Sequence, residues 1–149
     1  MMDNLKILSK KEVKPILKNL KDRFNFKKGL DYTILKNNQN KLFLINSQLK
    51  DIALDNLKIN SIGMYFGDFS DGIRLSIEGS QMIGNDCTKN ILELDDKNSK
   101  YWLTGLDLDI EYENKGFVLI KYADEFLGCG KAVTDKILNY VPKNRRLKK

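Results

Sequence analysis

The pattern of apolar and polar residues predicts an amphipathic helix near the start of the chain. Apolar side chains recur there with the spacing of one helical face: Val13, Ile16, Leu17, Leu20 and Phe24. Ser9 and Glu12 have the S-x-x-E spacing of a capping box, in which the two side chains satisfy free amides at a helix start. Pro15 lies too deep for the first turn of a helix capped by Ser9. We therefore expect either a kink at Pro15 or a regular helix that begins near Val13.

Short apolar runs after this helix predict a β-hairpin. Residues 31–35 and 42–45 are rich in apolar and β-branched side chains, and they flank the asparagine-rich turn 37–40. Asparagine tolerates the backbone conformations that tight turns require. Ser47 can then cap a short helix that runs through Ala53.

Two further strands are predicted at residues 58–66 and 73–77. The segment between them, 67–72, ends in Asp-Gly, which is a strong turn signal. We predict an N-terminal α+β domain that comprises residues 1–84. Because no long Pro/Gly/Ser linker follows, we expect the two parts of the protein to pack against each other.

The second part begins with the apolar run 91–94 and a predicted helix that Asp95 caps and Gly105 ends. Residues 106–113 then alternate strictly between apolar and acidic, which predicts a strand with one carboxylate face: Asp107, Asp109, Glu111 and Glu113. Alternate side chains on a strand lie about 7 Å apart, and no loop of the EF-hand type surrounds them. We therefore expect a solvated face and no metal site.

The chain closes with predicted strands at 117–122, 126–131 and 137–141. Pro142 cannot donate to a sheet ladder and should end the last of them. The cations that follow Pro142 should then project from a fixed exit point. These elements indicate a small β-barrel with one or two short helices, and an α+β protein overall.

Charge is distributed unevenly along the chain. The net charge is +6. Residues 1–28 carry nine lysines and arginines against three acids, and residues 131–149 carry seven against one, so the segment between them is acidic. A surface that binds a polyanion can be local in this way. A solvated tail is an equally good explanation for the N-terminal cluster, whereas an ordered strand and a proline precede the C-terminal one.

The sequence contains few of the residues and motifs that are typical of enzymes. There is no histidine, the commonest general base, and neither a P-loop nor a dinucleotide-binding fingerprint occurs. Cys87 and Cys129 are not spaced as a metal-binding pair, and we expect two reduced, buried thiols. We expect no cofactor and no enzymatic activity. No apolar run suits a membrane helix, and the start lacks the features of a secretory signal, which favours a cytoplasmic location.

The C-terminal motifs resemble a known family. Leu-Gly-Cys-Gly-Lys at 127–131, followed by Leu-Asn-Tyr-Val-Pro-Lys-Asn-Arg-Arg at 138–146, is similar to the PUA-like RNA-binding domain that ends ribosomal RNA 5-methylcytosine methyltransferases of the Sun/Nop2 class. Cys129 stands where that family has an aromatic residue. Residues 101–108 and 116–120 resemble its aromatic-leucine-x-glycine segment and its central strand. No methyltransferase domain accompanies these motifs, so the resemblance implies a stand-alone PUA-like domain at residues 85–149.

The resemblance implies structured RNA, either ribosomal RNA or transfer RNA, as the ligand. It also implies that the module assists, in trans, a separately encoded RNA methyltransferase or a step of ribosome assembly. The residues expected to bind RNA are Gly128, Gly130, Lys131, Asn139, Tyr140, Lys143, Arg145 and Arg146.

Each residue type has a chemical reason to be in this set. The cations would neutralise phosphates, and the arginines could instead make bidentate or stacked contacts. Glycine in a strand permits close approach of another backbone. Asn139 and Tyr140 could read or stack an unpaired base. The structural alternatives are a backbone hydrogen bond for Asn139 and a core or barrel-rim position for Tyr140. Trp102 and Phe117 are expected in the core.

Two other functions remain open. A protein-interaction subunit of an RNA-modification or ribosome-biogenesis complex would show an exposed apolar patch. An enzyme of the PUA-like superfamily would show a pocket where Lys, Asp or Tyr side chains converge with perturbed pKa values. RNA binding would show a continuous basic face.

Overall fold

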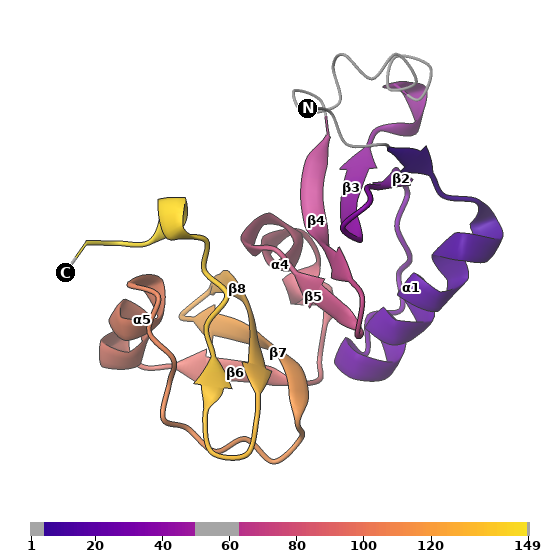
Figure 1. Ribbon diagram of the computed structural model, residues 1–149. Coiled ribbons are helices and arrows are strands. Elements are labelled where there is room, and N and C mark those ends of the chain that lie inside the picture. Colours follow the sequence, from indigo (N-terminus) through magenta and orange to yellow (C-terminus); the bar gives the residue numbers. More distant parts are fainter. Residues whose placement is uncertain (1–4, 50–62, 149) are drawn as a thin grey trace.

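The computed structural model describes residues 5–49 and 63–148, and it contains two sheets (Figure 1). The first sheet is antiparallel throughout, with neighbouring strands in the order β1-β2-β3-β4-β5. Its strands are β1 Lys6–Ile7, β2 Thr33–Lys36, β3 Lys41–Ile45, β4 Met64–Phe69 and β5 Ile73–Leu75. Together with the helices and the second sheet, this arrangement confirms the predicted α+β class.

Helix α1, Lys10–Phe24, has the predicted capping box. The Ser9 hydroxyl accepts from the Glu12 amide at 3.2 Å, and the Glu12 carboxylate accepts from the Ser9 amide at 3.0 Å. The helix begins at Lys10 and includes Pro15, so its regular part does not begin near Val13. One side of it is buried, at Ile16, Leu20 and Phe24.

The predicted hairpin is confirmed as β2 and β3. The buried Asn37 side chain holds its turn, because the Asn37 Oδ1 atom accepts from the amides of Gln39 and Lys41, both at 2.9 Å. After β3 comes the 3₁₀ turn η1, Ser47–Leu49. The predicted continuation of a helix to Ala53, and the start of a strand at residue 58, lie outside the described residues.

The prediction of a strand over 73–77 is wrong at its end, because Ile77 begins a helix. Helix α4, Ile77–Ile83, has Ser76 as its N-cap, whose hydroxyl accepts from the Gly79 amide at 2.9 Å. A Cβ on Gly79 would lie 2.2 Å from the Phe66 carbonyl oxygen, so glycine lets α4 lie directly on β4. The 3₁₀ turn η2, Gly84–Asp86, follows.

The second sheet has the order β6-β7-β8-β9. Its strands are β6 Ile91–Leu94, β7 Gly116–Tyr122, β8 Glu125–Ala132 and β9 Ile137–Leu138. Strand β6 runs parallel to β7, while the other pairs are antiparallel. Helix α5, Asp96–Leu103, connects β6 to the rest, and its predicted N-cap Asp95 is confirmed by a 2.8 Å bond to the Asn98 amide.

The strand predicted at 106–113 does not form. Within this segment the structure has a single bridge, between Leu108 and Ile137, because only Leu108 reaches the edge of β9. The predicted alternation is kept in part: the four carboxylates are exposed, Leu108 is buried, and Ile110 and Tyr112 are partly buried, but Leu106 is exposed. The last strand is also shorter than predicted and ends at Leu138, although Val141 beyond it is buried.

One apolar core spans both sheets. Leu119, Phe126 and Cys129 of the second sheet pack in the same cluster as α1 and strands β2 to β5. The predicted packing of the two parts against each other is thereby confirmed. A division at residues 84/85 falls between the sheets and stays a prediction. A second cluster, around the fully buried Trp102, lies within the C-terminal part.

Both cysteines are buried free thiols, and burial raises the pKa of each to about 12. In the described part of the chain, no three His, Cys, Asp or Glu side chains gather in a way that could hold a metal ion. No helix among residues 5–49 and 63–148 is long and apolar enough to cross a membrane.

Because the core is shared, we expect the two sheets to unfold together. Leu119→Ala should lower the free energy of unfolding by about 2–5 kcal/mol, the usual cost of a buried leucine. Circular dichroism and Trp102 fluorescence should follow one coincident transition in urea. Leu147→Ala, at a side chain that is 54% exposed, is the matched control and should change stability little. Two separate transitions would contradict the shared core.

Candidate nucleic-acid interface

The chain after β9 is fixed to the body of the protein. The Leu147 amide donates to the Leu103 carbonyl of α5 at 2.8 Å, and the Arg145 amide donates to the Pro142 carbonyl at 2.9 Å. The 3₁₀ turn η3, Lys143–Arg145, directly follows Pro142. The side chains of Lys143, Arg145 and Arg146 are exposed. The cations therefore leave an ordered segment, as predicted from the position of Pro142.

The two arginines of this segment do different things. Arg145 extends to α4, where its Nη1 atom lies 2.5 Å from the Glu78 carboxylate, and both side chains remain more than 40% exposed. Exposed ion pairs contribute only about 0–1 kcal/mol, so Arg145 can change partner easily. Arg146 instead donates from Nε to the Val141 carbonyl at 3.0 Å, and its side chain covers Gly105. Arg146 therefore helps to hold the segment in place.

Two adjacent aromatic rings with a cation at each end form a row across the two sheets: Lys131, Phe117, Tyr140 and Arg74. The Lys131 Nζ atom lies 5.6 Å from the centre of the Phe117 ring. Phe117 meets Tyr140 edge to face at 6.1 Å, and the Arg74 guanidinium carbon lies 4.4 Å from the centre of the Tyr140 ring. All four side chains are partly exposed. This cation–aromatic row brings two predicted site residues, Lys131 and Tyr140, onto one surface.

Arg74 is oriented by carboxylate and tyrosine groups of the first sheet. Its Nη2 atom lies 2.9 Å from Asp68, in an ion pair whose side chains are 23% and 20% exposed. The Tyr65 hydroxyl donates to the other oxygen of the same carboxylate. Burial, and then the hydrogen bond and charge of Asp68, raise the pKa of Tyr65 above its ordinary value. Tyr65 is thus a neutral donor at physiological pH and no general base.

The row borders a cleft of about 440 Å³ between the first sheet with α4 and the C-terminal part. This volume lies in the range of small-ligand sites, about 300–1,000 Å³. Cations and phenol rings line it on both sides: Lys41, Tyr65, Arg74, Tyr140 and Arg145. Such a lining offers positive charge and flat surfaces together, which suits a nucleotide.

The two predicted glycines lie in the interior. Gly128 has a φ of +97° and donates to the Ser80 hydroxyl of α4 at 2.9 Å, and a Cβ there would lie 3.3 Å from Ile77. A Cβ on Gly130 would lie 2.5 Å from Ile137 and 2.8 Å from the Trp102 ring. The close approaches that these glycines permit are made by the protein's own side chains, and both glycines are buried, but Gly128 also lines the wall of the cleft.

Asn139 is occupied by structural hydrogen bonds. Its Nδ2 atom donates to the carbonyls of Trp102 and Leu106 at 2.8 and 2.9 Å, and its Oδ1 atom accepts from the Val141 amide at 2.7 Å. These bonds join α5, the loop after it and the C-terminal segment. The structure thus favours the backbone-bonding role for Asn139 over base reading.

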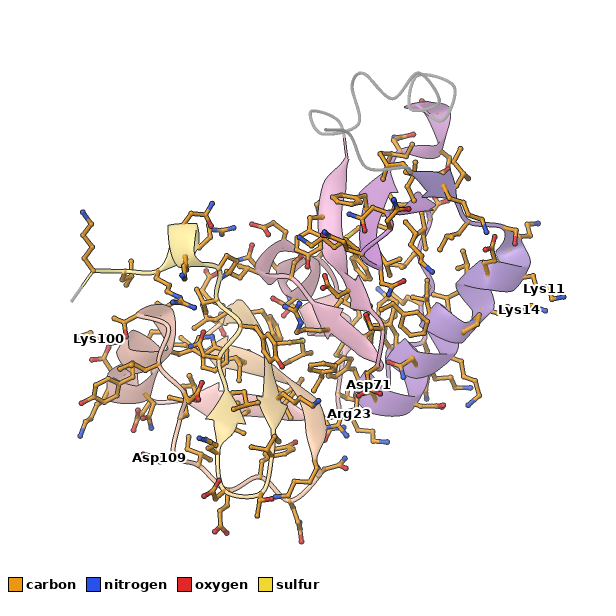
Figure 2. The ribbon with its side chains drawn as sticks, in the orientation of Figure 1. Lys11, Lys14, Arg23, Asp71, Lys100 and Asp109 are labelled. Carbon is orange, nitrogen blue, oxygen red and sulfur yellow. The ribbon has the colours of Figure 1, made fainter. Side chains whose placement is uncertain are left out.

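The N-terminal lysines lie on another side of the molecule. Lys11 and Lys14 project from α1, which lies at the opposite end of the view from the C-terminal segment (Figures 1 and 2). The N-terminal lysines therefore lie apart from the C-terminal segment and are not part of the candidate surface.

Sequence reasoning missed the contribution of the first sheet. Arg74 and Lys41 come from short strands far from the C-terminal motif in sequence, and no local signal relates them to Tyr140. The fully buried Trp102 was predicted correctly as a core residue. Phe117 was predicted as a core residue as well; it packs against the core but is only partly buried, and Lys131 lies over its ring.

Comparison with known proteins supports the C-terminal resemblance. Residues 89–147 match the family model of the PUA domain of the methyltransferase RsmF. The ribosomal RNA small subunit methyltransferase F of Vibrio vulnificus is 28% identical over 137 residues, which are 91% of this chain and 28% of that protein. The protein of the same name from Aeromonas salmonicida is 30% identical over 89 residues, which are 58% of this chain and 19% of that protein. The predicted resemblance to a PUA-like methyltransferase module is confirmed.

Asn139→Ala should destabilise the protein by about 1–3 kcal/mol, because it removes the side chain that pairs with the Leu106 carbonyl and the Val141 amide. Urea unfolding measures the effect, and amide exchange at Val141 should accelerate. Asn144→Ala, at an exposed asparagine of η3, serves as the control and should unfold like the wild type. Unchanged stability combined with weaker RNA binding would instead assign Asn139 the role of a base reader.

Proposed function

We propose that this protein binds structured RNA, with ribosomal RNA as the first candidate and transfer RNA as the second. The observation that carries the proposal is the match of residues 89–147 to the PUA domain of a methyltransferase whose relatives are named for ribosomal RNA. The cation–aromatic row and the cleft beside it support the same conclusion. They present positive charge and planar groups at one place on the surface.

The side chains divide the work of binding. Lys131, Lys143 and Arg145 neutralise phosphates, an interaction that weakens steeply as salt rises. The Arg74 guanidinium lies over the Tyr140 ring, and an unpaired base can stack on this pair, because a guanidinium and a phenol both offer flat surfaces. Arg146 and Asn139 contribute indirectly, by holding the C-terminal segment in place.

The proposal extends to the role of the complex. The protein positions RNA for a separately encoded methyltransferase or within a ribosomal particle, in the cytoplasm, and performs no chemistry of its own. The protein then acts as an adaptor that holds RNA through its basic surface, and no cofactor is required.

Binding of the intact protein to total ribosomal RNA and total transfer RNA across a salt series tests the function. We expect affinity that falls with salt and prefers the ribosomal pool. A preference for the transfer RNA pool would identify transfer RNA as the ligand and would still support RNA binding. Equal and weak binding to both pools would contradict the proposal, since it would reveal only nonspecific attraction of a basic protein to polyanions.

A charge-removing variant tests the site. Lys131→Gln, Lys143→Gln and Arg145→Gln together should weaken binding and flatten the dependence of log affinity on log salt by about 2–3, since each lost phosphate contact removes roughly 0.7–0.9 from the slope. The matched control removes the same charge from α1, through Lys10→Gln, Lys11→Gln and Lys14→Gln. The control should lose much less affinity. Equal losses would show that total charge, and not the proposed surface, governs binding.

A further inference from the structure

Apolar side chains gather on the surface where α5 meets the C-terminal segment. Tyr101, Leu106 and Leu147 remain 45%, 38% and 54% exposed, and among the described residues Tyr32 is the only other large apolar side chain exposed to this degree. The three side chains line a hollow of about 510 Å³ together with Lys100, Thr104 and Lys148. Contiguous exposed apolar surface commonly marks a binding site.

Lysines surround this apolar floor. The Lys97 Nζ atom lies 5.9 Å from the centre of the Tyr101 ring, and Lys100 and Lys148 stand at the edge of the hollow. Figure 2 shows Lys100 on α5, on the side of the molecule where the C-terminal segment ends. Lys100 pairs with Asp96 at 3.1 Å, but both side chains are about 70% exposed, so the ammonium group is easily given to another anion.

The hollow is held in shape by backbone contacts. The Leu147 amide donates to the Leu103 carbonyl at 2.8 Å. Gly105 has a φ of +94°, which lets the chain turn after α5, and the Arg146 side chain packs against it. These contacts fix both walls of the hollow, so little order has to be created on binding.

We infer that this α5–tail platform, formed by Tyr101, Leu106, Leu147, Lys97, Lys100 and Lys148, binds an unpaired nucleotide of the RNA. The base stacks on the Tyr101 ring, and the lysines take the adjoining phosphates. Aromatic rings within a cationic groove bind single-stranded nucleic acid in this way. The inference rests on the proposed function and adds a binding residue, Tyr101, to it.

Two observations favour RNA over an apolar protein segment as the occupant. First, the rim is cationic, which complements a phosphate chain. Second, the platform is continuous with the proposed RNA surface, because one short segment serves both. Arg145 reaches Glu78 at the cleft, while Leu147 and Lys148 line the hollow. An RNA strand that crosses this segment from the cleft meets the platform next.

Titration of the ribosomal RNA pool with Tyr101 variants across a salt series tests the inference. Tyr101→Ala and Tyr101→Leu should each weaken binding about tenfold, the usual size of one stacking contact, and the salt slope should stay unchanged because no charge is lost. Tyr101→Phe keeps the ring and should bind within about twofold of the wild type. Tyr32→Ala is the matched control, at a tyrosine with similar exposure outside the platform.

The possible outcomes separate the inference from the function on which it rests. If the wild type binds neither RNA pool with preference, the proposed function fails, and the platform fails with it. If the wild type binds but Tyr101→Ala binds equally well, only the platform is overturned. If Tyr101→Leu binds like the wild type while Tyr101→Ala is weaker, the hollow needs apolar bulk and no stacking ring. That result would also overturn the inference, because the contact would not depend on an aromatic ring.

Discussion

The contact between the two sheets is the constraint on which the other features depend. Phe126 of β8 lies against Gly84 so closely that a Cβ there would be 2.5 Å from the ring. Cys129 and Leu119 join the same core as α1. Since apolar burial is the main stabilising term in folding, this core fixes the position of β7 and β8 relative to β5. The cleft exists only because that position is fixed, as its two walls come from the two sheets.

A polar seam, formed by Arg23 of α1 and its hydrogen-bond partners in the C-terminal part, adds to the apolar contact between the two parts of the protein. The Arg23 guanidinium donates to the carbonyls of Phe117 and Asn114 at 2.6 and 2.8 Å, and the Arg23 carbonyl accepts from the Asn90 side chain at 2.6 Å. Burial lowers the pKa of Arg23 from its ordinary value, yet arginine stays charged at physiological pH. The seam holds the start of β7, and hence Phe117, at the centre of the cation–aromatic row.

Local patterns in the sequence predicted most of the secondary structure. The capping box of α1, the hairpin at β2 and β3 and the N-cap of α5 each depend on residues close together in the chain, so the sequence alone was sufficient for them. Helix α4 was missed because residues 73–77 alternate between apolar and polar like a strand, and the cap formed by Ser76 outweighs that pattern. The segment 106–113 had the right alternation for a strand, but pairing needs a neighbour, and only Leu108 finds one.

The candidate site was predictable only in part, for a related reason. Lys131, Tyr140 and Arg145 belong to one compact motif that predicts a binding site, and the structure brings them to the cleft and the row. Gly130 and Asn139 belong to the same motif but make internal contacts, and Gly128 is buried yet lines the cleft, since a motif does not reveal which of its faces is buried. Arg74 and Lys41 come from the other sheet, and their approach to Tyr140 depends on the packing of the whole molecule.

The carboxylates beside the cleft decide which cations are available to an anion. Asp68 holds Arg74 in a pair that is mostly shielded from water, and the Tyr65 hydroxyl shares the same carboxylate. If Arg74 left Asp68 for another anion, the Asp68 carboxylate would remain desolvated and unpaired, which costs free energy. Glu78 and Arg145 are exposed on both sides, so water can solvate the carboxylate once the arginine leaves. Arg74 is therefore a fixed planar surface, whereas Arg145 is the cation at the cleft that can exchange its carboxylate for a phosphate.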